Sequence, residues 1–182
     1  MFQIATERMI LRDWQSGDFA DACLYAADPE VSRYMEWGPN SERETRDFVY
    51  GAIDSAREKP RRAYELAVEL KAEKKVIGGI GLAIKDPGYS TGFLGYAFNR
   101  EYWGQGLCSE ASLEMLRYGF EELELHRVFA TCDTRNDGSR RVLEKCGMRR
   151  EAHFLEDSHI KGAWRDSYLY AILKREWLLR AV

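Results

Sequence analysis

A short glycine-containing segment, Gly104-Gln105-Gly106-Leu107-Cys108-Ser109, has the residues best suited to bind an anion. Its two glycines allow the backbone to pass close to a ligand. Apolar residues at helical spacing follow, so the N–H groups of Gln105 to Ser109 would open a helix whose dipole favours negative charge. A phosphate or pyrophosphate would fit there. The alternative is that the two glycines only form a tight turn before an ordinary helix.

Other patterns for phosphate, hydrolase and metal chemistry are incomplete. In a dinucleotide-binding G-x-G-x-x-G motif the third glycine would fall at Ser109, and the Gly-Lys-Ser/Thr of a Walker loop does not occur. Three histidines could serve a Ser-His-Asp hydrolase, but the sequence has no G-x-S-x-G elbow. Four cysteines without a C-x-x-C pair favour free buried thiols over zinc or disulfides. We therefore expect no metal site.

Several helices must position the anion-binding segment, and the hydrophobic period predicts them. The first has a predicted N-cap at Ser16, and the second begins at a Ser41/Glu44 capping box and ends near Lys59. The third follows Gly106, and the fourth ends at Gly147. Residues 174–182 form a short helical tail.

Strands alternate with these helices. Alternation over 64–70 and 80–84 predicts an antiparallel hairpin, with Glu65 on its polar side. The apolar run 93–98 suits a central strand buried on both faces. With an opening strand, and further strands at 127–132, 148–154 and 166–173, the order is β-α-α-β-β-β-α-β-α-β-β. This predicts an α/β fold with a mixed sheet of about seven strands and helices on both faces.

Length and composition set outer limits. A chain of 182 residues suggests a single domain over 1–182, and 45% hydrophobic with 31% charged residues is typical of a soluble globule. The net charge of −3, without an extended basic run, argues against nucleic acid as a partner. Residues 1–13 lack the apolar run of a signal peptide, and no long apolar stretch suggests a membrane span. We expect a cytoplasmic protein.

Residues 95–111, from Gly95-Tyr96-Ala97-Phe98 to Cys108-Ser109-Glu110-Ala111, resemble the acyl-CoA signature of the GNAT superfamily of N-acetyltransferases. The branch they resemble is that of the ribosomal-protein alanine N-acetyltransferases and their small-molecule relatives. Residues 6–12 look like that branch's opening strand, and residues 136–148 look like its second CoA segment. Residues 162–166, followed by Tyr170, are similar to its closing hairpin.

This resemblance implies a GNAT-like fold that binds acetyl-CoA as acyl donor. In the family, amides at a helix start hold the CoA pyrophosphate, which maps onto Gly104, Gln105, Gly106, Leu107, Cys108 and Ser109. The preceding strand pairs its backbone with the pantetheine amides, which maps onto Tyr96, Ala97 and Phe98. Asn136 would bond the pantetheine arm and Ser139 would lie near the thioester sulfur, with helix capping as the alternative for both.

The chain departs from the family pattern at its catalytic positions. Leu143 occupies the place of a tyrosine that protonates the thiolate, and Ser158 that of the branch's proposed base. Ser139 is then the local candidate for the acid. For the base we favour Glu156 over Glu151, His153, His159 and Glu36, although each could simply be a solvated or structural residue. Glu36 and Trp37 lie in an aromatic loop that in the family lines the acceptor side.

The expected function is transfer of an acetyl group from acetyl-CoA to a primary amine, either a protein N-terminus or a small molecule. The amine would attack directly in a ternary complex. The alternative is an acyl-CoA-binding regulatory domain that has the same fold and no acceptor chemistry. The sequence leaves the acceptor and a homodimer open.

Overall fold

The computed structural model describes residues 2–86, 88 and 90–181. Its strands are β1 (Gln3–Ala5), β2 (Met9–Asp13), β3 (Ala63–Leu70), β4 (Lys75–Asp86), β5 (Thr91–Phe98), β6 (Arg127–Asp133), β7 (Arg149–Ile160) and β8 (Ala163–Leu173). Its helices are α1 (Phe19–Ala26), α2 (Glu42–Ser55), α3 (Leu107–Glu121), α4 (Asp137–Lys145) and α5 (Lys174–Leu178), with short 3-10 turns η1 (Ser16–Asp18), η2 (Arg100–Tyr102) and η3 (Leu179–Ala181). The predicted α/β class is confirmed.

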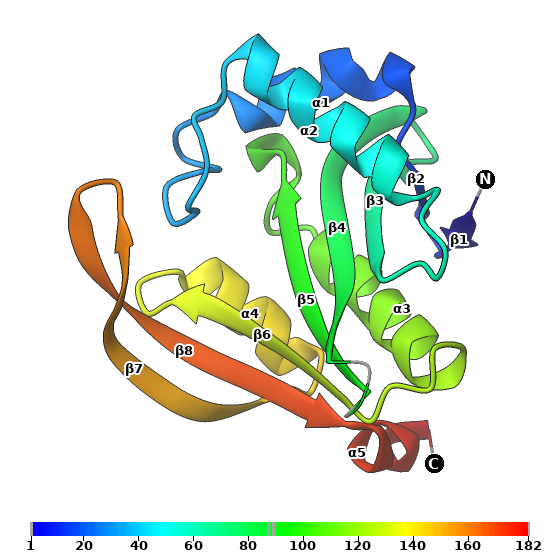
Figure 1. Cartoon of the computed structure of the whole chain (residues 1–182), viewed down its shortest axis with the longest axis vertical. Helices are drawn as coiled ribbons and strands as arrows, with labels where there is room; N and C mark the ends of the chain where they lie inside the picture. The colour runs from blue at the N-terminus through cyan, green and yellow to red at the C-terminus, as the bar shows by residue number, and fades with distance from the viewer. Residues whose placement is uncertain (1, 87, 89, 182) are drawn as a thin grey trace.

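One mixed sheet, in the order β1-β2-β3-β4-β5-β6-β8-β7, runs through the molecule, and the β7–β8 hairpin projects from it (Figure 1). The described strands number eight rather than the predicted seven, because residues 6–12 do not form one strand. Thr6 N donates to Met9 O at 2.9 Å, which turns the chain so that β1 pairs antiparallel with β2. The rest of the predicted element order stands.

Helix ends follow local signals with two exceptions, the end of α2 and the start of α1. The Ser41/Glu44 capping box is confirmed, with Ser41 N donating to Glu44 Oε2 at 2.8 Å, although α2 ends at Ser55 rather than near Lys59. The prediction of Ser16 as the cap of α1 is wrong, because residues 16–18 form η1 and Asp18 occupies the N-cap. The helical tail extends through residue 181, and the last residue lies outside the described part of the chain.

The pleat of the sheet separates two hydrophobic cores. Leu66 and Val68 of β3 point to the face of the sheet that α3 covers. They form one core there with Met115 and Phe120 of that helix. Ala67, between them, points to the face covered by α1 and α2. Since side chains alternate along a strand, Glu65 shares the face of Ala67 rather than that of Leu66.

A buried ion cluster attaches the start of α1 to the sheet. Arg12 of β2 donates from both terminal nitrogens to the carboxylate of Asp18 at 2.8 Å, and from Nε to Glu69 Oε2 at 2.8 Å. The side chains of Arg12 and Asp18 are 10% and 8% exposed. Hydrogen bonds to the Asp18 carboxylate raise the pKa of Arg12 above its usual range. The cluster therefore holds three elements together through charge.

The sheet opens between β5 and β6. These two strands are parallel and pair only from Thr91–Arg127 to Phe93–Phe129, whereas β5 stays paired with β4 as far as Phe98. Beyond Phe93 the two strands diverge (Figure 1). The prediction that this strand is buried on both faces is wrong, because Phe93, Tyr96 and Ala97 are only half-buried where the sheet opens.

Candidate functional site

A cavity of about 930 Å³ lies at the opening between β5 and β6. Several predicted site residues line it, namely Glu36, Trp37, Tyr96, Ala97, Asn136 and Ser139. The β7–β8 hairpin reaches the loop after α1, since Lys161 Nζ donates to Ser32 O at 2.5 Å. The opening of the sheet thus gathers residues that are far apart in sequence.

The predicted anion-binding turn lies outside the lining of this cavity, at the start of α3. Gly104 and Gly106 have φ of +75° and +78°, the left-handed region that favours glycine. Gly104, Gln105 and Gly106 are exposed. The amides of Leu107, Cys108 and Ser109 precede the first bond of the helix, from Glu110 N to Gly106 O at 3.0 Å. The turn therefore presents backbone donors at the positive end of a helix.

Side chains fix this turn against the sheet. Arg8 forms an ion pair with Glu110 at 2.7 Å and donates from Nη1 to Gln105 O at 3.0 Å. Trp103 Nε1 donates to Phe98 O at 2.8 Å, which ties the turn to the end of β5. Phe98 itself is buried in the core, so it can offer a ligand only its backbone.

Cys108 contributes no reactive thiol to the turn. Its side chain packs against the core under α3, and burial beside Cys146 raises the pKa of the Cys108 thiol far above its ordinary value. A protonated thiol is a poor nucleophile, so this geometry does not suit an acyl-cysteine intermediate. All four cysteines are unpaired.

Tyr96 and Ser139 bring two hydroxyl groups together at the cavity. Their oxygens lie 2.9 Å apart, and Tyr96 Oη also donates to Ser139 O at 3.2 Å. Burial raises the pKa of Tyr96 well above 10, so the phenol stays neutral at physiological pH. The sequence predicts a role for the backbone of Tyr96 alone, so its hydroxyl is a site group that the sequence did not predict. The available signal was a tyrosine in a strand whose other aromatic residues are phenylalanines.

Asn136 is the N-cap of α4. Its Oδ1 accepts a hydrogen bond from Ser139 N at 3.0 Å, which is the capping role left open in the sequence analysis. The cap also holds Ser139 in place beside Tyr96. A contact of Asn136 with a ligand remains a prediction.

Replacing Asn136 with alanine should destabilise the protein by about 1 kcal/mol, because the first turn of α4 loses its cap. Asn136→Asp keeps a hydrogen-bond acceptor at the same place, so its free energy of unfolding should stay near that of the wild type. Urea unfolding of the two variants tests this. Equal midpoints for Asn136→Ala and the wild type would show that the cap contributes nothing.

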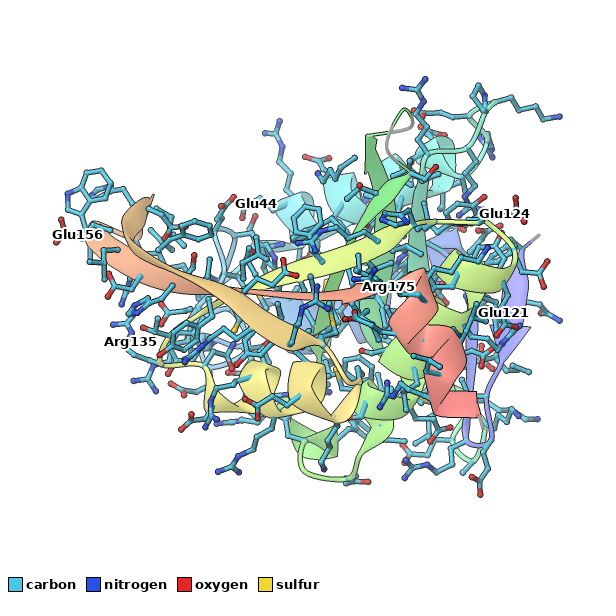
Figure 2. The ribbon with its side chains drawn as sticks, turned by 90° about the horizontal axis from the view of Figure 1, so that it is seen from below. Glu44, Glu121, Glu124, Arg135, Glu156 and Arg175 are labelled. Atoms are coloured by element: carbon cyan, nitrogen blue, oxygen red, sulfur yellow. The ribbon has the colours of Figure 1, made fainter. Side chains whose placement is uncertain are left out.

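Glu156 is not among the residues that line the cavity. Between Phe154 and Ser158 the pairing of β7 with β8 shifts register, and Glu156 occupies this bulge with φ of +47°. Its N–H donates to Asp166 Oδ1 at 2.9 Å, and its side chain is exposed at the outer end of the hairpin (Figure 2). The extra residues in the bulge turn Glu156 outward.

The other candidate bases also have surroundings of their own. Glu151 pairs with Arg127 and Arg149, and its hydrogen bond to Arg127 holds its pKa below the usual range. His153 lies 3.5 Å from Asp166, and the ring of His159 packs against Trp164. Of the predicted bases, only Glu36 belongs to the cavity lining within the described chain.

Glu65 of β3 also lines the cavity. The sequence predicts only that this carboxylate lies on the polar side of a hairpin. Desolvation by burial raises its pKa above its ordinary value. The signal for it lay on the neighbouring strand, where Gly79 and Gly81 stand opposite Ala67 and Glu65. Those glycines leave space on this face of the sheet.

Two further findings concern only the part of the chain that the structure describes. No group of three or more His, Cys, Asp or Glu side chains there could hold a metal ion. No helix among these residues is long and apolar enough to cross a membrane.

Comparison with known proteins places this geometry in context. A family model described as an acetyltransferase (GNAT) domain matches residues 8–149. An uncharacterized N-acetyltransferase of Bacillus subtilis, YnaD, is 36% identical over 174 residues, which cover 96% of this chain and 98% of YnaD. A GNAT-family acetyltransferase structure from Bacillus anthracis superposes with a TM-score of 0.85 at 35% identity, covering 96% of this chain and all of that one.

A ribosomal-protein-S5-alanine acetyltransferase from Vibrio fischeri has a TM-score of 0.79 at 24% identity. The superposition covers 97% of this chain and 99% of the Vibrio fischeri chain. At this level of identity the likeness concerns the fold alone.

Proposed function

The chain belongs to the GNAT acetyltransferase family, and from this premise we propose that it transfers the acetyl group of acetyl-CoA to a primary amine. The acceptor would be a protein N-terminus or a small-molecule amine. The reaction would take place in a ternary complex, without a covalent enzyme intermediate.

The divergence of β5 from β6 carries this proposal. Past Phe93 the edge of β5 that faces β6 has no partner strand among the described residues. An extended chain with amide groups, such as pantetheine, could pair there with the backbone of Tyr96, Ala97 and Phe98. The glycine turn at the start of α3 follows directly, and its amides would hold the pyrophosphate.

The paired hydroxyls support the chemistry proposed at the thioester. The attacking amine forms a C–N bond to the carbonyl carbon, and the C–S bond breaks to release the CoA thiolate. Ser139 and Tyr96 would donate hydrogen bonds to the sulfur as its negative charge develops. Leu143, at the position of the family's tyrosine, is fully buried and cannot act there.

The acceptor would enter from the loop between α1 and α2. Glu36 and Trp37 line the cavity there, and a carboxylate beside an aromatic ring suits a cationic amine. An α-amine with a pKa of about 7.7–8.0 is partly neutral at physiological pH. A lysine-type amine, with a pKa of about 10.4, needs roughly 4 kcal/mol to lose its proton and therefore needs a base.

Release of CoA from acetyl-CoA tests the proposal directly. We expect turnover with at least one member of a panel containing an alanyl peptide, spermidine and an aminoglycoside, with CoA quantified by chromatography. Tight binding of CoA by calorimetry without turnover on any amine would favour an acyl-CoA-binding regulatory domain. Comparable affinities for ATP and CoA would instead indicate a general nucleotide-binding protein.

A further inference from the structure

Glu65 lies across the sheet toward the opening between β5 and β6. It pairs in register with Gly81 of β4, which in turn pairs with Gly95 of β5. A Cβ on Gly81 would overlap the Glu65 carboxylate, so the side chain extends over Gly81. Neighbouring strands lie about 4.8 Å apart, so the carboxylate is about one strand spacing from β5.

The Glu65 carboxylate lacks a partner, unlike Asp133, Asp157 and Glu44 of the same cavity lining. Asp133 pairs with Arg135 at 2.6 Å, Asp157 accepts from Ser167 Oγ at 2.6 Å, and Glu44 belongs to the capping box of α2. Glu65 has neither a hydrogen bond nor an ion pair among the described residues, and only the more distant charge of Lys85 lowers its pKa. A partly buried carboxylate without a counterion is unfavourable until a cation arrives.

Tyr25 of α1 is a second polar group without a partner at the same place. Its side chain is 4% exposed and lines the cavity, yet its hydroxyl makes no hydrogen bond within the described chain. Tyr25 Oη would lie 3.5 Å from a Cβ on Gly79. The hydroxyl therefore reaches the part of the sheet that lines the cavity beside Glu65. Burial and the charge of Glu65 raise its pKa, which keeps the phenol neutral and able to accept a hydrogen bond.

Glu65 and the paired hydroxyls lie on opposite faces of the sheet. Tyr96 pairs with Ile80 and packs with the core under α3, whereas Glu65 shares the face of α1 and α2. The cavity reaches both groups through the opening between β5 and β6. An acceptor could therefore approach the thioester carbonyl from one face while the sulfur leaves toward the other.

We propose that Glu65, with Tyr25 beside it, binds the ammonium group of the acceptor and accepts one of its protons. This inference rests on the proposed acetyl transfer. The ammonium gives one proton to Glu65, and the neutral nitrogen then forms the C–N bond. As the C–S bond breaks, the second nitrogen proton neutralises the CoA thiolate, and Glu65 returns its proton to solvent.

Glu65→Gln should lower kcat/KM for spermidine about 100-fold or more at pH 7, while the affinity for CoA stays unchanged. Glu58→Gln is the matched control, because Glu58 is exposed and is not among the cavity-lining residues. A Glu156→Gln variant tests the rival base. A loss in Glu156→Gln together with full activity in Glu65→Gln would overturn the assignment.

The pH profile separates proton transfer from a structural role. In the wild type, kcat/KM should reach a plateau between the pKa of Glu65 and that of the amine. In Glu65→Gln, kcat/KM should instead rise about tenfold per pH unit below the pKa of the amine, because the fraction of neutral amine rises in this way. The ionisable groups on elements around Glu65 are Tyr25 of α1, Glu44 of α2, Lys85 of β4 and Glu36 of the loop. Identical profiles for the wild type and Glu65→Gln would overturn the proposal.

Gly81→Ala provides a second variant that keeps the carboxylate but displaces it. The added methyl group meets the end of a flexible side chain, so the fold should persist while kcat/KM falls at least about tenfold. Wild-type activity in Gly81→Ala would contradict the proposed position of Glu65. If the wild-type protein acetylates no amine, the proposed function fails. If it does and Glu65→Gln matches it, only the role of Glu65 fails.

Discussion

Replacement of Ser139 by alanine should lower kcat about 100-fold and leave the affinity for CoA within about twofold. A group that assists proton transfer or stabilises charge in the transition state typically contributes 10²-fold or more. Two contacts position the Ser139 hydroxyl for this role. Its oxygen lies 2.9 Å from Tyr96 Oη, and the backbone N–H of Ser139 donates to Asn136 Oδ1. Steady-state kinetics and calorimetric CoA binding provide the two measurements.

Tyr96→Phe should give a loss similar to that of Ser139→Ala, and the double variant should lose little more than either alone. Groups that act as one unit are not additive, because the first substitution already disables the pair. Tyr50→Phe is the control, since Tyr50 is 51% exposed and does not line the cavity. Fully additive losses, or equal losses in kcat and CoA affinity, would reject a paired role at the sulfur.

Arg12→Ala should destabilise the protein by about 3–5 kcal/mol, the cost typical of removing one partner from a buried ion pair. Two carboxylates, Asp18 and Glu69, would lose the cation that both contact at 2.8 Å. Urea denaturation monitored by tryptophan fluorescence measures the change.

Arg43→Ala provides the comparison for this loss. The Arg43–Asp47 pair is 3.9 Å long, with side chains 90% and 71% exposed, and should contribute less than about 1 kcal/mol. If Arg12→Ala and Arg43→Ala cost the same, the cluster does not anchor α1 to the sheet.

Features that depend on a few neighbouring residues could be predicted from the sequence. The Ser41/Glu44 box, the left-handed Gly106 before α3 and Gly147 after α4 are local signals, and each appears where expected. The glycine turn before α3, the predicted anion-binding site, belongs to this class, because glycine spacing and a helical pattern are enough to locate the turn.

The missed residues depend on contacts between distant segments. Alternation along 64–70 puts Glu65 on a polar face, but α1 and α2 cover that face, so the residue becomes part of a cavity floor. The exposed position of Glu156 has a related cause. Once a bulge shifts the register of β7, the positions on either side of it no longer follow one alternation, and no residue type in 154–158 marks the shift.

If acetyl-CoA binds as proposed, the opening between β5 and β6 would also link the stability of the protein to the supply of this metabolite. In the proposed complex the acetyl-CoA donor completes the strand edge that β5 leaves without a neighbour, so the donor would favour the folded state by mass action. At about 100 times the dissociation constant this amounts to about 2.7 kcal/mol. The resistance of this protein to unfolding, and to the proteases that act on unfolded chains, would then rise and fall with the concentration of acetyl-CoA around it.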